Sequence, residues 1–358
     1  MTKWISYSLV VAAILASCNM NPNNQPKTNK QESLSTEEDQ KLLAQAQGIF
    51  KPVPEIAESP NNTVTPEKVK LGKFLYFDTR LSKTGNNSCN SCHNLNTFGV
   101  DNLATSPGDE GKNGNRNSPT SFNAALHTLQ FWDVRAKDVE EQAGMPVLNP
   151  VEMNIPSEDF LIKRLKGIEL YKELFASAFP DEKDPLTFKN MTKAIGAFER
   201  TLVTPSKFDE YLHGKSEVLS YEEKKGLQTF INEGCTTCHN GVAIGGNSLQ
   251  KFGSLDNYRN YTGSTIEDEG RKEVTKEEFD KDLFKTPSLR NVTKTAPYFH
   301  DGSVEELNRA ITIMGKIQLG KDFSPEQVTS IKAFLEALTG DIKDEVKQIP
   351  TELEGIKI

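Results

Sequence analysis

Apolar residues recur at α-helical spacing in two similar segments, one in each half of the chain. Helix starts are predicted at residues 65–67, where a proline follows a threonine, and at residues 220–223, which form a Ser-x-x-Glu capping box. Each segment also carries a glycine followed four residues later by an aromatic residue. These pairs are Gly72 with Tyr76 and Gly226 with Phe230. The shared pattern indicates a repeat.

A second helix is predicted near the end of each half. In the first half its apolar positions are Met191, Ile195, Phe198 and Leu202. In the second half a capping box at residues 324–327 precedes apolar positions at Val328, Ile331, Phe334, Leu335 and Leu338. Residues 94–119 and 240–287 are typical of loops, and no strand alternation of any length is visible. The pattern therefore predicts an all-α fold.

The motif C-x-x-C-H follows the first helix of each half. Its two copies are Cys89, Cys92 and His93, then Cys235, Cys238 and His239. The motif is typical of c-type haem attachment, in which two thiols bond to the haem vinyl groups and the histidine ligates the iron. Four thiolates also suit a structural zinc ion, but the pairs are 146 residues apart and zinc needs neither histidine. We therefore expect two covalently bound c-type haems.

The order of helix, haem motif, loop and closing helix defines two tandem cytochrome c-like domains, each enclosing one haem. Residues 36–203 are predicted to form the N-terminal haem domain and residues 204–340 the C-terminal one, with residues 341–358 as a C-terminal tail. The roughly 320 residues that follow residue 35 suit two domains better than one.

The N-terminal segment has the composition of an export signal. Residues 1–17 combine an early lysine, an apolar run and small residues, and the run is too short to span a bilayer stably. Residues 15–18 resemble a bacterial lipobox, which predicts lipidation at Cys18; a plain signal peptide is the alternative. Residues 18–35 are predicted to be a disordered tether. We expect an extracytoplasmic, periplasmic protein that contacts a membrane only through its lipid.

The net charge of the chain indicates which kinds of partner it could bind. The formal net charge of −8 gives no sign of nucleic-acid binding and leaves a small basic electron carrier as a suitable partner.

Each haem iron needs either a sixth ligand or an open position. Met314, in the apolar segment 311–315, is the candidate in the second half, and a Met/His pair raises the haem potential and suits electron transfer. The first half offers His127, Met145 and Met153. His127 lies in a predicted helix at residues 124–129, where a packed or capping role is the simpler interpretation. An open face at the first haem would allow substrate to bind there.

Seven blocks of sequence resemble the bacterial di-haem cytochrome c peroxidases across nearly the whole mature chain. They are FDTRLS at 77–82, RNSPT at 116–120, QFWDVRA at 130–136, NPVEMN at 149–154, PSLRNV at 287–292, PYFH at 297–300 and MGKIQLG at 314–320. The resemblance implies a low-potential, peroxide-binding haem held by His93. It also implies a high-potential haem held by His239 and Met314, which receives the electrons.

The resemblance also implies roles for other side chains. Glu152 matches the family's distal acid–base glutamate, and Gln142 its distal amide. Trp132 matches the tryptophan between the haems. A calcium site at the domain interface is implied by the matches at Asn117, Thr295 and Pro297.

We therefore predict a cytochrome c peroxidase, an oxidoreductase that reduces hydrogen peroxide with electrons from a small carrier such as a cytochrome c or a copper protein. A homodimer is compatible with this prediction. One alternative is a di-haem electron-transfer cytochrome without peroxidase activity. Another is a related enzyme that oxidises a protein or organic substrate, such as the methylamine dehydrogenase maturation enzymes. Those relatives have tyrosine where this chain has Met314.

The chain departs from the family pattern at one loop. Most relatives have a histidine sixteen residues after the first haem-binding histidine, and it caps the peroxide haem in the resting enzyme. Here that position is Asp109, within residues 106–111, which contain no histidine. We expect Asp109 and Glu110 to face water and the first haem to be open or water-ligated when oxidised. His127 as a substitute cap is the alternative.

Overall fold

The structure, a computed structural model, describes Met1 and residues 33–354. From Leu34 onward the chain forms one compact unit. The predicted signal peptide at residues 1–17, the lipidation site Cys18 and most of the tether at residues 18–35 lie outside the described residues.

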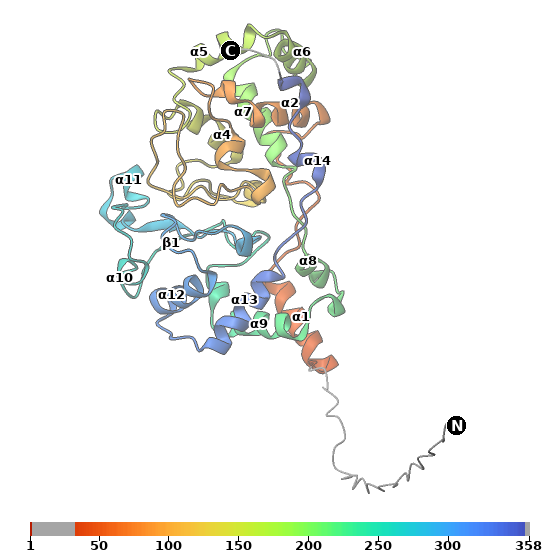
Figure 1. Ribbon diagram of the computed structural model, residues 1–358, viewed down its shortest axis with the longest axis vertical. Coiled ribbons are helices and arrows are strands. Elements are labelled where there is room, and N and C mark those ends of the chain that lie inside the picture. The colour runs from red at the N-terminus through yellow and green to blue at the C-terminus, as the bar shows by residue number, and fades with distance from the viewer. Residues whose placement is uncertain (2–32, 355–358) are drawn as a thin grey trace, which may run out of the picture. The chain divides into compact units, whose positions relative to one another are not determined.

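Helices supply nearly all the regular structure, as the all-α prediction requires (Figure 1). They are α1 (Thr36–Ile49), α2 (Pro66–Phe77), α3 (Cys89–Cys92), α4 (Val139–Leu148), α5 (Glu158–Lys166), α6 (Glu169–Ala178), α7 (Phe188–Glu199), α8 (Lys207–Leu212), α9 (Tyr221–Asn232), α10 (Arg259–Thr262), α11 (Lys272–Thr275), α12 (Leu307–Leu319), α13 (Pro325–Glu336) and α14 (Asp344–Lys347). In the described part of the chain, strands are limited to the antiparallel pair β1 (Leu249–Lys251) and β2 (Leu283–Lys285).

The predicted helix starts are observed, and side-chain caps explain them. Thr65 caps α2 by accepting a hydrogen bond from the Lys68 backbone N–H, and Pro66 occupies the first turn. Ser220 and Ser324 begin α9 and α13, each with a complete capping box. These caps satisfy N–H groups that the first turn of a helix leaves without partners.

The repeated glycine lets two helices cross closely in each half. A Cβ on Gly72 of α2 would lie 1.9 Å from Ala194 O of α7. A Cβ on Gly226 of α9 would lie 1.9 Å from Ser330 O of α13. Because backbone atoms occupy the space that a side chain would need, glycine is required at both crossings.

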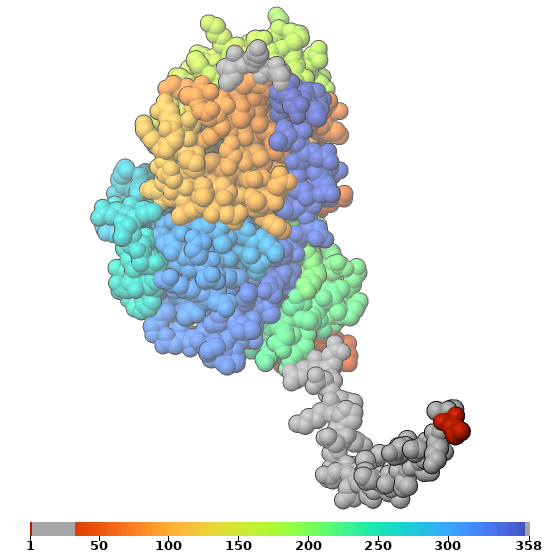
Figure 2. Space-filling view, viewed as in Figure 1, coloured from red at the N-terminus to blue at the C-terminus, as the bar shows by residue number. Residues whose placement is uncertain are grey.

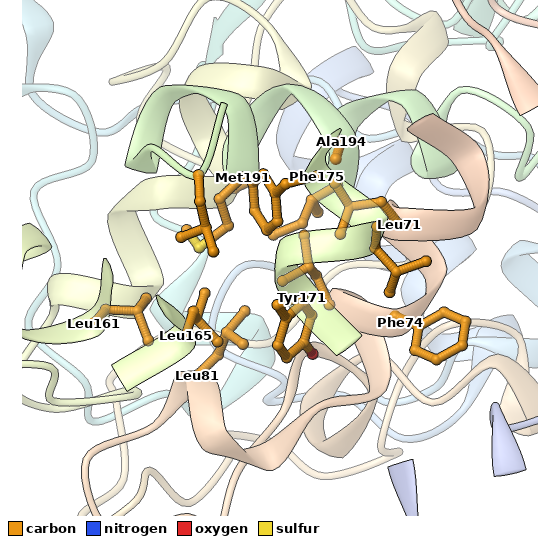
Figure 3. Close-up of a cluster of buried hydrophobic side chains, with 14 of the residues drawn as sticks. Leu71, Phe74, Leu81, Leu161, Leu165, Tyr171, Phe175, Met191 and Ala194 are labelled. Atoms are coloured by element: carbon orange, nitrogen blue, oxygen red, sulfur yellow. The ribbon is translucent and has the colours of Figure 1, made fainter. Parts of the chain in front are cut away.

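Two large clusters of buried apolar side chains lie in the unit. The first joins α2 and α4 to α7, and Figure 3 shows side chains such as Leu71, Phe175 and Met191 pointing toward one another. The second joins α1, α8, α9 and α13 around Phe208 and Phe334. The second helix predicted for each half is therefore the one against which the first helix packs.

The two ends of the chain each pack beyond the half to which the sequence assigned them. The helix α1, within predicted domain 36–203, buries Leu42 and Ala46 in the second cluster. The predicted tail at 341–358 contributes Ile342 and Val346 to a cluster beside α2, and Figure 2 shows this blue segment against the orange surface. The division at residue 203 stays a prediction, and these contacts link its two parts.

Among the helices of the described residues, we find none that combines the length and apolar character of a membrane span.

Candidate active site

A cavity of about 710 Å³ adjoins the first C-x-x-C-H motif. Residues from three stretches of the first half line it, and Glu273, Val274 and Lys285 from the second half complete its wall. The predicted site residues on this wall are Cys89, Cys92, His93, Asn117, Trp132, Gln142 and Glu152. Its size lies within the usual range for cofactor and ligand pockets. The fold thus brings the predicted peroxide-site residues around one space.

His93 is held in the orientation that a metal-binding histidine needs. It follows α3, and its Nδ1 donates to Pro119 O at 2.8 Å. Tyr76, the aromatic residue of the first repeat, donates its hydroxyl to His93 O at 2.7 Å. Because the proton lies on Nδ1, the Nε2 lone pair is free to ligate iron.

The two thiols beside His93 suit covalent haem attachment. Cys89 and Cys92 are not joined by a disulfide, and both reach the cavity wall. Burial raises the pKa of Cys92 to about 11 and the pKa of Cys89 well above its ordinary value. A neutral, half-buried pair of thiols next to an oriented histidine fits a haem bound through thioethers.

Glu152 lies in the turn after α4, and its neighbours fix its side chain. Asn149 Nδ2 donates to Glu152 Oε1 at 2.7 Å, while Asn149 Oδ1 accepts the Val151 N–H at 3.0 Å. Burial raises the pKa of Glu152 above its ordinary value, against the opposing positive charge of Arg135. The carboxyl group can therefore exchange a proton closer to neutral pH than a surface glutamate can.

The loop that lacks the family's capping histidine packs against Glu152. A Cβ on Gly108 would lie 1.8 Å from Val151 O, and the Asp109 N–H donates to Glu152 O at 2.7 Å. The Asp109 side chain accepts hydrogen bonds from Ser82 Oγ, from the Thr84 N–H and hydroxyl, and from the Asn86 N–H.

The prediction that Asp109 faces water is therefore wrong. The residue is only 5% exposed, because four donors converge on its carboxylate. Glu110 is exposed as expected and pairs with Lys83 at 3.2 Å. Burial alone would raise the pKa of Asp109, but hydrogen bonds from Ser82, Thr84 and Asn86 outweigh it and hold the pKa below its ordinary value.

Gln142 and Trp132 reach the same cavity from different elements. Gln142 projects from α4, one of the helices of the first cluster. Trp132 lies in a loop, where its Nε1 donates to Asn117 O at 2.9 Å and its carbonyl accepts the Lys285 N–H at 2.7 Å. Because Lys285 belongs to β2, Trp132 is held directly against the second half of the chain.

His127 is not in a helix that extends through residues 124–129. The 3-10 helix ends at Leu126, and His127 has extended backbone angles. Its Nδ1 lies 3.2 Å from Lys285 Nζ, and its Nε2 is buried without a hydrogen-bond partner. Of the other first-half candidates, Met153 packs in the first hydrophobic cluster at the cavity wall.

The second motif has a similar local arrangement. His239 comes shortly after a 3-10 helix at Cys235–Thr237, its Nδ1 donates to Ile244 O at 3.3 Å, and burial lowers its pKa to about 4. Phe230, the aromatic residue of the second repeat, lies 6.4 Å from the His239 ring. Met314 is half-buried within α12. Its role as a ligand stays a prediction.

The candidate calcium ligands come from two segments that meet. The Asn117 N–H donates to His300 O at 2.7 Å, and Asn102 Nδ2 donates to Ala296 O at 2.9 Å. Asn117 is thus beside the segment that contains Thr295 and Pro297. Whether the three residues bind calcium stays a prediction.

Sequence reasoning missed the ionic framework of the cavity. Arg116 pairs with Asp133, Asp268 and Glu273, and Arg135 also pairs with Asp133. Both arginines stand in blocks that carry the family resemblance, but two partners of Arg116, Asp268 and Glu273, lie in the segment 240–287, whose sequence shows no periodic pattern.

Comparison with known proteins identifies the family to which the chain belongs. The model of the di-haem cytochrome c peroxidase family matches residues 66–217. The cytochrome c551 peroxidase of Pseudomonas aeruginosa is 45% identical over 303 residues, which cover 84% of this chain and 86% of that protein. The chain belongs to the di-haem cytochrome c peroxidase family. Membership makes it an oxidoreductase of the peroxidase class.

Two further comparisons agree with this family. The cytochrome c551 peroxidase of Nitrosomonas europaea is 45% identical over 289 residues, covering 80% of this chain and 84% of that protein. A crystal structure of a MauG-like protein associated with microbial copper homeostasis has a TM-score of 0.74 at 27% identity, covering 84% of this chain and 97% of that one. The family fold therefore extends well beyond residues 66–217.

Proposed function

We propose that the chain reduces hydrogen peroxide to water, taking two electrons and two protons per peroxide, with the electrons supplied singly by a small carrier protein. The observation that carries this proposal is the position of Glu152 and Gln142 on the wall of the cavity that His93 enters. A haem bound by Cys89, Cys92 and His93 would supply an iron that binds peroxide and accepts electrons.

Glu152 is suited to move the proton that this reaction requires. Cleaving the O–O bond heterolytically needs a proton to leave one oxygen and reach the other, and a single carboxylate can accept and return it. Asn149 holds Glu152 Oε1 at 2.7 Å, which leaves the other carboxyl oxygen for this exchange. Gln142, on the wall of the same cavity, can donate a hydrogen bond to a peroxide oxygen.

Electron entry is assigned to the second haem, held by Cys235, Cys238, His239 and Met314. A Met/His pair gives a high potential suited to receiving electrons. Two haems held by the two motifs would supply one-electron stores for the two electrons that one peroxide consumes. Trp132 is proposed to lie on the path between them, and its hydrogen bond from Lys285 of β2 supports a position where the two halves meet.

The remaining assignments accompany this proposal. We infer a calcium ion near Asn117, Thr295 and Pro297, and periplasmic attachment to a membrane through lipidated Cys18. A MauG-like oxidation of a protein or organic substrate is the second candidate, favoured by the structural likeness at a TM-score of 0.74. Met314 supports the peroxidase, because those relatives have tyrosine at this position. A purely electron-transferring cytochrome would have no use for a cavity lined by Glu152 and Gln142.

The test combines haem counting with turnover on the purified mature protein. We expect two covalent haems per chain and peroxide-dependent oxidation of reduced cytochrome c in the same sample. One haem per chain, or no oxidation above background with several small carriers, contradicts the proposal.

A further inference from the structure

Three cationic side chains line the first cavity: Arg116, Arg135 and Lys285. Both arginines are paired with carboxylates of the protein. In the part of the chain that the structure describes, Lys285 has no carboxylate within ion-pair distance, and the hydrogen bond recorded for its ammonium is to His127 Nδ1 at 3.2 Å. Lys285 therefore carries a charge that the protein itself leaves unbalanced.

This lysine is buried and fixed in position. It is 5% exposed, it lies opposite Leu249 in the β1–β2 pair, and its backbone N–H donates to Trp132 O at 2.7 Å. Burial lowers the pKa of Lys285 to about 8, so the ammonium is still the main form at neutral pH. A buried, unpaired ammonium is unfavourable unless an anion is provided.

His127 adds a second donor that has no acceptor. Because Lys285 donates to Nδ1, the proton of the neutral imidazole lies on Nε2. That atom is buried and without a hydrogen-bond partner. A Cβ on Gly246 would lie 2.5 Å from His127 Cδ2, so the ring is packed against the second half and has little freedom to move. Lys285 thus lines the cavity with its position fixed by His127, whose ring is itself held in place.

We propose that Lys285, positioned by its hydrogen bond to His127 Nδ1, forms an anion subsite that binds a propionate carboxylate of the haem in the first cavity. The inference rests on the proposed function to the extent that a haem occupies this cavity. Attachment through Cys89 and Cys92 uses the vinyl groups of the haem, and its two propionates remain as anionic acceptors. Such a carboxylate supplies the negative charge that Lys285 lacks and an acceptor for the ammonium N–H groups that do not bind His127.

The subsite also argues against His127 as an iron ligand. With Nδ1 accepting from Lys285, Nε2 carries the proton and has no lone pair to offer iron. In addition, Lys285 comes from β2 and would tie the haem of the first half to the second half. A positive charge beside a propionate favours the reduced, less positive state of the iron.

The experiment replaces the charge and measures the haem potentials of the complete two-haem protein. In Lys285→Met we expect the redox equilibrium of the first haem to shift about tenfold toward the ferric state, which is about 59 mV for a one-electron couple. The second haem should not change. Lys285→Arg should keep most of the wild-type potential of the first haem, because it retains the positive charge. Lys285→Gln, which keeps a donor without the charge, provides a second neutral variant in case the methionine variant does not fold.

The control is Lys281→Met, which removes an exposed lysine paired with Glu269 at 3.4 Å in the same part of the chain. It should leave both potentials unchanged. The inference is overturned if both neutral variants keep the wild-type potential of the first haem, or if the potential of the second haem shifts instead. Haem content and peroxide turnover of the wild-type protein are measured separately, so failure of the proposed function is distinguishable from failure of this subsite.

Discussion

Asp109 provides a strong test of how the distal side of the cavity is built. Its carboxylate accepts hydrogen bonds from Ser82 Oγ at 2.6 Å, Thr84 N at 2.8 Å, Thr84 Oγ1 at 2.8 Å and Asn86 N at 3.3 Å. Its backbone N–H holds Glu152 O at 2.7 Å. Asp109→Ala removes the four side-chain interactions and leaves that backbone hydrogen bond without its anchor.

The expected loss of stability follows from these contacts. A hydrogen bond to a charged group contributes about 1.5–3 kcal/mol. Ser82 can turn to Thr79 O, which lies 3.0 Å away, and water can reach Thr84 and Asn86, which are partly exposed. Removing a buried charge also returns some desolvation energy. We therefore expect the free energy of unfolding to fall by about 3 kcal/mol, and turnover to fall about tenfold as Glu152 becomes less well positioned.

Urea unfolding and peroxide turnover at equal haem content measure the two effects. Glu110→Ala is the matched control, because this neighbouring carboxylate is exposed and solvent screens its ion pair with Lys83. The pKa of Asp109 is lowered in the folded state. Its contribution to the free energy of unfolding is therefore fully present above the ordinary pKa of an aspartate and is lost as pH falls through the lowered pKa. The difference between Asp109→Ala and wild type should therefore shrink below about pH 4. Wild-type stability and turnover in Asp109→Ala would refute the anchoring role.

Three further predictions concern the crossings and the haems. Gly226→Ala should destabilise the protein by about 2–3 kcal/mol in urea unfolding, because its Cβ would lie 1.9 Å from Ser330 O. Gly48→Ala, whose Cβ would meet nothing within 4 Å, should be neutral or stabilising. Equal stabilities of the two variants would contradict the close crossing. Met314→His should lower the reduction potential of the second haem in a redox titration and leave peroxide binding at the first haem intact; an unchanged potential would place the sixth ligand elsewhere. Electron paramagnetic resonance of the oxidised protein should show one high-spin and one low-spin ferric haem, with immediate reaction with peroxide. Two low-spin haems, with activity only after pre-reduction, would indicate a sixth ligand that caps the first haem. If His127→Ala removed that ligand, His127 would be identified as the cap.

Local sequence signals predicted the helices well. The caps at Thr65, Ser220 and Ser324 stand where α2, α9 and α13 begin. These signals act within one helical turn, so the sequence displays them directly. The glycine and aromatic repeat also had a local signature, although its meaning became clear only from contacts. Gly72 permits a close helix crossing, and Tyr76 binds the backbone of His93.

Such local signals could not predict long-range packing. Nothing in the local pattern of α1 says that Leu42 packs with Phe208 and Phe334. Asp109 was expected in water, like Glu110, because carboxylates are poor haem ligands beside imidazole and are mostly exposed. Its burial depends on donors at 82–86, which only the folded loop brings together. Lys285 was overlooked for the same reason, since its unbalanced charge is visible only once the cavity wall is assembled.

The central claim is that Glu152 transfers the proton during peroxide reduction in the cavity of His93. The most direct measurement compares the peroxide turnover of Glu152→Gln with that of the surface control Glu110→Gln at equal content of two haems. We predict a loss of about 10²-fold or more in Glu152→Gln, unchanged haem spectra, and wild-type turnover in the control. Because burial raises the pKa of Glu152, the wild-type rate should fall with decreasing pH at a higher pH than for an ordinary glutamate, and this decline should vanish in Glu152→Gln. Near wild-type turnover in Glu152→Gln would contradict the account.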